Sequence, residues 1–248
     1  RAENSGGGLN VLNCIGGGTA QVAFWFNITA SDVLIHRCVF DADLMTDSYS
    51  IAHFDGSDVF DNLTITNNEF YNGSIFAGNS SYNSTGFILT GNLFDGAMLN
   101  LSSQFQNATI SGNEFKNNGY TNMQVGLKNS TIENNIFYDT GPSPHSGYPS
   151  SVLMLWGNQY TLTPSENVSI ENNTFYYNGF AAPEEAANGL RIQDGIDAST
   201  ITVYNNSFIN GGGQSAAQAI LNQATTGVAD ASANWLGNSD PASVAAAV

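Results

Sequence analysis

The side chains best suited to acid–base chemistry gather between residues 139 and 197. They are Asp139, His145, Tyr148, Arg191, Asp194 and Asp197. A histidine or a pair of carboxylates can act as general acid and base, and an arginine or tyrosine can remove the proton beside a sugar carboxylate. Catalysis would need these groups to converge in space. An exposed ion pair between Arg191 and Asp194, with His145 in a solvated loop, explains the same residues without catalysis.

A second group of polar side chains is suited to holding a cation. Asp41, Asp43, Asp55 and Asp58 follow one another within a short stretch of the sequence. Ca²⁺ prefers oxygen ligands, so these four aspartates are candidate calcium ligands. Their spacing matches neither an EF-hand loop nor a Gly-Gly-x-Gly-x-Asp repeat, and a solvated acidic turn is the alternative. We predict that the protein requires no cofactor and that Ca²⁺ is the candidate ion.

The two cysteines, Cys14 and Cys38, lie 24 residues apart. This spacing is about one turn of the sequence repeat described below. Stacked strands lie roughly 4.8 Å apart, which is close to the Cα separation of a disulfide. A disulfide and a pair of buried thiols are therefore the two alternatives.

The charge balance of the chain narrows the choice of partners. The sequence has 21 acidic and 5 basic residues and a formal net charge of −16. Such a chain repels nucleic acids, anionic lipids and polyanionic glycans at long range, and its bases are scattered singly. No apolar run reaches the roughly 18 residues of a membrane helix. We predict no nucleic-acid partner and no membrane span.

A repeated pattern organises most of the chain. It has the form Thr/Ser-Ile-x-Asn/Gly-Asn-x-Phe and ends at Phe70, Phe94, Phe115, Phe137, Phe175 and Phe208, and a weaker copy that ends at Phe40 precedes these. The shortest intervals, 21 to 24 residues, set the repeat length. The Ile region alternates as a strand does, the Asn or Gly pair suits a left-handed bend, and the Phe returns to the core. Stacked units would align the asparagines 68, 92, 113, 135, 173 and 206 into a hydrogen-bonded ladder.

This pattern resembles the right-handed parallel β-helix repeats of the pectate-lyase-like and NosD-like superfamily. The resemblance implies an all-β solenoid of roughly 8–10 coils. Asn234-Trp-Leu-Gly237 resembles the Asn-Trp-Trp-Gly segment that often follows the last coil, so Trp235 is expected to pack over the open core. We predict one domain over residues 1–248. It comprises a cap or first coil over 1–30, repeat coils over 30–233 with insertions near 139–165 and 178–189, and a cap and tail over 234–248.

The sequon Asn-x-Ser/Thr occurs at eleven asparagines, namely 27, 62, 72, 79, 83, 100, 107, 129, 167, 172 and 205. Asn62, Asn107, Asn129 and Asn167 fall at one point of the repeat, just before the strand, where an exposed turn is expected. These four are the candidate glycosylation sites. A repeat rich in Asn, Ser and Thr also creates sequons by composition alone.

Tyrosines recur shortly after the core phenylalanines, at positions 71, 120, 138, 176 and 177. They are expected either to form an exposed stripe that stacks on sugar rings or to cover the outside of the turn. The catalytic blocks of polygalacturonase-like hydrolases, pectate lyases and alginate epimerases, which the superfamily contains, are missing from the sequence. The leading hypothesis is an extracellular or cell-surface structural or adhesive protein whose partners are carbohydrate or copies of itself. The alternative is a polysaccharide hydrolase or lyase with a groove near Arg191.

Overall fold

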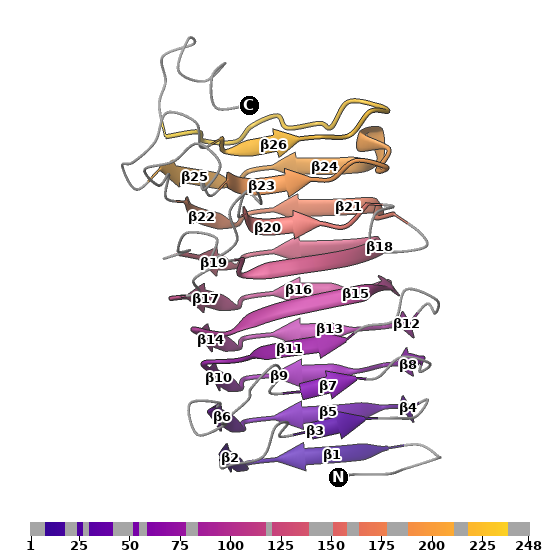
Figure 1. Ribbon diagram of the computed structural model, residues 1–248, viewed down its shortest axis with the longest axis vertical. Helices are drawn as coiled ribbons and strands as arrows, with labels where there is room; N and C mark the ends of the chain where they lie inside the picture. Colours follow the sequence, from indigo (N-terminus) through magenta and orange to yellow (C-terminus); the bar gives the residue numbers. More distant parts are fainter. Residues whose placement is uncertain are drawn as a thin grey trace.

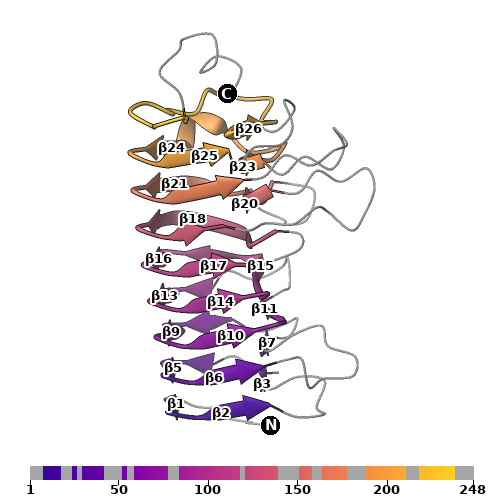
Figure 2. The same ribbon diagram turned by 90° about the vertical axis from the view of Figure 1, so that its left-hand side faces the viewer.

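The computed structural model describes residues 8–17, 24–26, 30–41, 52–54, 59–77, 84–117, 121–138, 151–157, 164–177, 188–210 and 218–237. In these residues the chain winds into stacked coils, and each coil adds strands to the three faces of a long prism (Figures 1 and 2). Successive coils pair in parallel, with Phe40 beside Phe70 and Phe137 beside Phe175, for example. The predicted all-β parallel β-helix is therefore confirmed.

The first face carries the strand of each repeat that contains the Ile position. Its strands are β1 (Leu9–Leu12), β5 (Val33–His36), β9 (Thr64–Thr66), β13 (Ile88–Thr90), β16 (Thr109–Ser111), the C-terminal half of β18 (Met123–Glu133), β21 (Glu166–Glu171) and β24 (Ile201–Tyr204). Inward and outward residues alternate along these strands, as in Val33–His36, where Val33 and Ile35 are buried. The polar positions between them face outward.

The second face carries the core phenylalanines and has eight strands among the described residues. They are β2 (Ile15–Gly17), β6 (Val39–Asp41), β10 (Glu69–Tyr71), β14 (Leu93–Asp95), β17 (Glu114–Lys116), β19 (Ile136–Phe137), β22 (Thr174–Tyr177) and β25 (Ser207–Asn210). The rings from Phe40 to Phe208 form one stack, with centroids 4.4 to 5.3 Å apart. Eight strands agree with the predicted number of coils.

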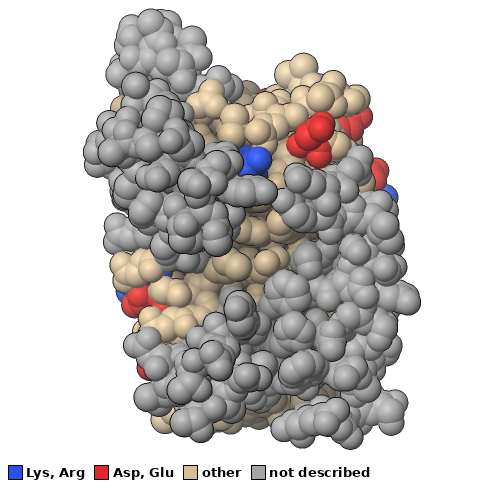
Figure 3. Space-filling model, viewed as in Figure 1, with Lys and Arg blue, Asp and Glu red and all other residues tan. Residues whose placement is uncertain are grey.

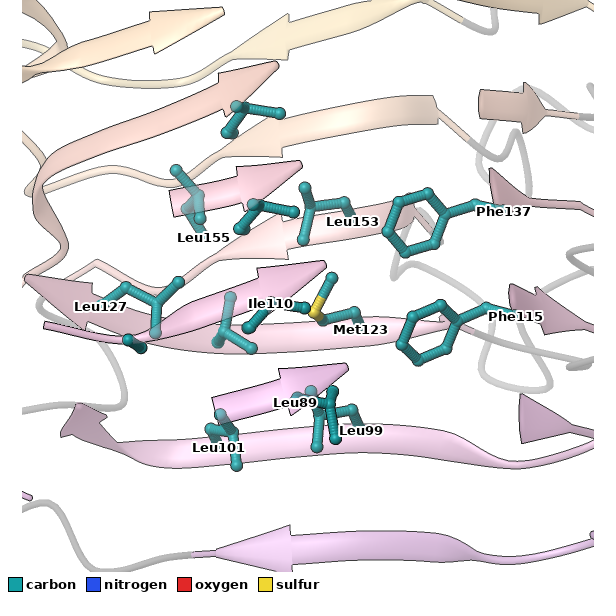
Figure 4. Close-up of a cluster of buried hydrophobic side chains, with 14 of the residues drawn as sticks. Leu89, Leu99, Leu101, Ile110, Phe115, Met123, Leu127, Phe137, Leu153 and Leu155 are labelled. Carbon is teal, nitrogen blue, oxygen red and sulfur yellow. The ribbon is translucent and has the colours of Figure 1, made fainter. Parts of the chain in front are cut away.

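The third face closes the prism. Its strands are β3 (Phe24–Phe26), β7 (Ala52–Phe54), β11 (Ser74–Ala77), β15 (Met98–Gln106), the N-terminal half of β18, β20 (Ser151–Leu155), β23 (Asn188–Ile192) and β26 (Ile220–Asn222). The short strands β4 (Ala30–Ser31), β8 (Phe60–Asp61) and β12 (Ser84–Thr85) and the 3-10 helix η2 (Ala198–Thr200) lie between the third and first faces. Apolar side chains from all three faces meet in the core, as the stacked Leu, Ile, Met and Phe side chains of Figure 4 show.

The predicted asparagine ladder is confirmed. Asn135 shows its geometry: its Oδ1 accepts hydrogen bonds from both the backbone N–H and the Nδ2 of Asn113, each at 2.9 Å. Its Nδ2 donates to the carbonyl of Ile110 and to Oδ1 of Asn173, each at 3.0 Å. The same pattern links Asn68 through Asn206, and Asn234 extends it by one coil. Because the ladder residues from Asn68 to Asn206 are buried, their bonds satisfy polar groups that water cannot reach.

The C-terminal segment continues the stack, but the residue that covers the core differs from the prediction. Trp235 pairs with Ser207, which is an outward position, and 52% of its surface stays exposed. Leu236, the next residue, takes the inward position over Phe208 and packs against the core. The pleat alternates sides at every residue, so only one of the two adjacent residues can face inward.

The long repeat intervals are single coils that carry insertions. Phe137 pairs with Phe175, and Phe175 pairs with Phe208, so no extra coil lies between them. Within the first interval, β20 is fully buried and forms part of the third face. Residues 139–150, 158–163 and 178–187, which make up most of the predicted insertions, lie outside the described part of the chain.

Candidate functional site

The outer surface of the second face changes character along the helix axis. In each coil from β6 onward, two outward residues flank the buried phenylalanine of this face. Toward the C-terminus several of these outward residues are apolar or aromatic, beside the hydroxyl residues Thr174 and Ser207. Ile136, Tyr176 and Trp235 are 44%, 40% and 52% exposed, and Tyr138 and Ile209 lie between them on the same surface. We call these five residues the aromatic patch.

Contacts within the aromatic patch hold its rings in place. Tyr138 and Tyr176 are on successive coils, and their rings meet edge to face with centroids 6.2 Å apart and an interplanar angle of 87°. The Tyr138 hydroxyl donates to Oε1 of Glu114 on the preceding coil. Edge-to-face pairs of this kind are favourable beyond the area they bury. The aromatic patch is thus a largely apolar surface in which the Tyr138 hydroxyl is fixed by Glu114.

The N-terminal half of the same surface carries the acidic residues of this face, together with the outward apolar side chains of Ile15, Val39 and Leu93. Asp41, Glu69, Asp95 and Glu114 point outward there. Lys116 lies 3.6 Å from both Asp95 and Glu114 and partly compensates them. Tyr71 donates to Glu69 at 2.8 Å, and this hydrogen bond, with smaller contributions from burial and the nearby acids, raises the pKa of Tyr71. We call this region the acidic half.

The tyrosine stripe expected from the sequence has fewer members in the structure. Tyr71, Tyr138 and Tyr176 each follow a core phenylalanine by one residue and face outward. Tyr177 follows by two residues, so it turns inward and is 3% exposed, and burial raises its pKa. Tyr120 lies outside the described residues. Because the strand alternates sides, residues an even number of positions from the phenylalanine face inward and those an odd number away face outward. This count separates Tyr177 from the outward tyrosines and also identifies Ile136 as an outward residue.

The described acid–base candidates have structural partners. Arg191 lies on β23 between Met154 and Leu221 of the neighbouring coils, and its Nε donates to Oε1 of Gln223 at 2.6 Å. Asp194 accepts from the Gly195 N–H at 2.8 Å and from the Thr225 hydroxyl at 3.2 Å.

Asp197 caps η2 by accepting from the Ser199 N–H at 3.0 Å. Asp139, His145 and Tyr148 lie outside the described part of the chain. Figure 3 shows both kinds of charge on the described surface of this side: a basic group lies near the centre of the upper half, and a cluster of acidic groups lies to its right. The catalytic hypothesis therefore stays a prediction.

Of the calcium candidates, the structure describes Asp41. Its Oδ1 accepts from Nδ2 of Asn72 at 3.3 Å. Asp43, Asp55 and Asp58 lie outside the described residues. Within the described ranges no three His, Cys, Asp or Glu side chains come together as metal ligands. The calcium site remains a prediction from the sequence.

Cys14 and Cys38 occupy the ladder position in the first two coils, on the N-terminal side of Asn68. The Cys38 N–H donates to Oδ1 of Asn68 at 2.9 Å, and the Cys14 N–H lies 3.4 Å from the Cys38 sulfur. Both are thiols in this structure, and burial, together with the neighbouring Cys38, raises the pKa of Cys14 to about 11. The pair is thus stacked on adjacent coils, as its spacing in the sequence predicts.

Comparison with known proteins agrees with this architecture. The family model for a right handed beta helix region matches residues 88–230, more than half of the chain. The protein therefore belongs to the right-handed β-helix family. No curated protein matches it. Among the described residues, no helix has the length and apolar character needed to cross a membrane.

Proposed function

We propose that this β-helix is a secreted or cell-surface protein with a structural or adhesive role, and that its aromatic patch binds carbohydrate. The patch is the single observation that carries the proposal. Tyr and Trp rings have broad apolar faces and polar edges, which suit sugar rings that carry both C–H groups and hydroxyls. Stacked coils give the patch a rigid base, so few side chains lose freedom when a ligand binds.

The surroundings of the aromatic patch favour a glycan over a second copy of the chain. Thr174 and Ser207 place hydroxyls beside the rings, and Glu114 holds the Tyr138 hydroxyl. A stable protein interface buries about 800 Å² per partner, with a largely apolar core. Five apolar side chains bordered by hydroxyls and acids suit a narrower ligand. The net charge of −16 favours a neutral glycan over a polyanionic one.

The proposal predicts binding to one or more neutral polysaccharides in a pull-down or calorimetric panel. Tyr176→Ala and Trp235→Ala should each weaken binding by about fivefold, which corresponds to about 1 kcal/mol for a lost aromatic contact. Tyr71→Ala is the matched control, because Tyr71 is an outward tyrosine of the same face in the acidic half. We expect this variant to bind as the unaltered protein does.

Two results would contradict the proposal. An equal loss of binding in Tyr71→Ala would mean that the aromatic patch contributes no more to polysaccharide binding than the acidic half does. The second contradicting result has two parts: no polysaccharide binds, and the unaltered protein sediments as oligomers whereas Tyr176→Ala sediments as a monomer. The partner of the aromatic patch would then be a second copy of the chain.

A further inference from the structure

The structure divides the asparagines of the repeat into two sets. The ladder asparagines are buried, and none of them begins a sequon. Among the described sequons, seven asparagines are exposed and adopt the left-handed conformation, with φ between 50° and 59°. They are Asn62, Asn72, Asn107, Asn129, Asn167, Asn172 and Asn205. Asn100, the eighth described sequon, has its Oδ1 buried without a hydrogen-bond partner.

The three residues of these sequons have a shared geometry. In Asn129-Ser130-Thr131, the asparagine is exposed, Ser130 is 4% exposed, and Thr131 points outward from the first face. The sequons at Asn62, Asn107, Asn167, Asn172 and Asn205 likewise have a buried middle residue, 1% to 2% exposed, and an outward Ser or Thr. Because a strand alternates sides, the amide and the hydroxyl that a glycosyl transferase must recognise share one surface.

We propose that the exposed corner between the third and first faces is an N-glycosylation edge, comprising Asn62, Asn107, Asn129 and Asn167. The inference rests on the proposed function, because the chain must reach a compartment that holds the donor. An oligosaccharide leaves a polyprenyl-phosphate donor as the anomeric C–O bond breaks. A new bond forms from the anomeric carbon to Asn Nδ2, and Nδ2 releases one proton to the departing phosphate. The amide keeps one N–H for a hydrogen bond.

The edge also limits how many glycans fit. Asn107, Asn129 and Asn167 lie on three successive coils, and Nδ2 of Asn167 donates to Oδ1 of Asn129 at 3.0 Å. Coils repeat roughly every 4.8 Å, which is narrower than a hydrated, branched oligosaccharide. One coil lies between those of Asn62 and Asn107, and it has Gly86 at the same corner position. We therefore assign Asn62 as an uncrowded site and the other three as competing sites.

The test is a glycopeptide and intact-mass analysis of the protein purified from its own cells. We expect a glycan at Asn62, none at Asn100, and no molecule with all three competing sites occupied. In Asn129→Gln, occupancy at Asn107 and Asn167 should rise while that at Asn62 is unchanged. Thr64→Ala, which keeps Asn62 but removes the outward hydroxyl, should lose the Asn62 glycan with an unchanged circular dichroism spectrum.

An unmodified mass, or a glycan on Asn100, would overturn the proposal. Full occupancy of the three competing sites on one molecule would overturn the crowding argument and with it the assignment of competing sites. These outcomes are separable from those of carbohydrate binding, because the aromatic patch is tested by binding of the unglycosylated chain.

Discussion

Asn134 and Asn135 are adjacent in the sequence and identical in type, yet they do opposite things. Asn135 is 1% exposed and uses both ends of its amide in the ladder. Asn134 is exposed, and its backbone adopts a left-handed conformation with φ of 56°. The difference comes from the side of the chain that each occupies. Asn135 stabilises the coil through its side-chain hydrogen bonds, whereas Asn134 stabilises it because asparagine tolerates a positive φ.

The same contrast holds at every position of the coil. We call the buried positions that stack along the axis the inner column, and the exposed positions the outer column. Inner positions hold Ile, Phe and Asn in stacks that repeat almost unchanged, because each must fit the coil before and after it. Outer positions vary from acids to hydroxyls to aromatic rings along a single face. The inner column therefore specifies the fold, and the outer column is free to carry the aromatic patch and the sequons.

The largest expected effect comes from a charge in the inner column. Phe137→Asp would bury an unpaired carboxylate between Phe115 and Phe175, and we expect a loss of more than about 5 kcal/mol and failure to fold. Ile136→Asp is the matched control. Ile136 is 44% exposed, so its loss should stay below about 1 kcal/mol. Circular dichroism and urea titration measure both, and equal effects would mean that the register of β19 is wrong.

Removing one ladder amide should have the next largest effect. Asn135→Ala leaves the Asn113 N–H and the Ile110 carbonyl without their buried partners, and we expect a loss of about 4 kcal/mol. The midpoint of urea unfolding measures it. A loss below about 1 kcal/mol would show that water enters the corner and replaces the amide.

The third prediction concerns Cys14 and Cys38, which hold the first two ladder positions of the inner column. If Cys14 and Cys38 lose two hydrogen atoms to a disulfide oxidant such as oxidised glutathione, the crosslink joins the first coil to the second. We expect the disulfide in protein from an oxidising compartment, with a stabilisation of about 3 kcal/mol that a reductant removes. Mass spectrometry after alkylation without reductant measures the bond. Two alkylated cysteines in that sample would favour the pair of buried thiols over the disulfide. The double variant Cys14→Ser, Cys38→Ser is the control, because a reductant should leave its stability unchanged.

The inner column was predictable from the sequence because its physics is local and repeated. Ile, Asn and Phe recur at fixed offsets, and stacking them requires the ladder and the ring column. The outer column was less predictable. Tyr177 and Trp235 were assigned by residue type, but their sides depend on an exact count of residues from Phe175 and Phe208. The catalytic and calcium candidates depend on contacts between residues far apart in the sequence, which a repeat pattern does not specify.

The smallest predicted effect tests the outer column itself. If Asn134 serves chiefly by tolerating a positive φ, Asn134→Gly should be nearly neutral, because glycine adopts this conformation freely and stands at the equivalent corner in Gly91 and Gly112. Asn134→Ala should cost about 1 kcal/mol, because its Cβ strains the same backbone. Urea unfolding of the two variants measures the difference. If alanine were as well tolerated as glycine, the left-handed bend would not be what selects asparagine here. If both variants lost as much as Asn135→Ala, the outer asparagine would be contributing hydrogen bonds as the inner one does.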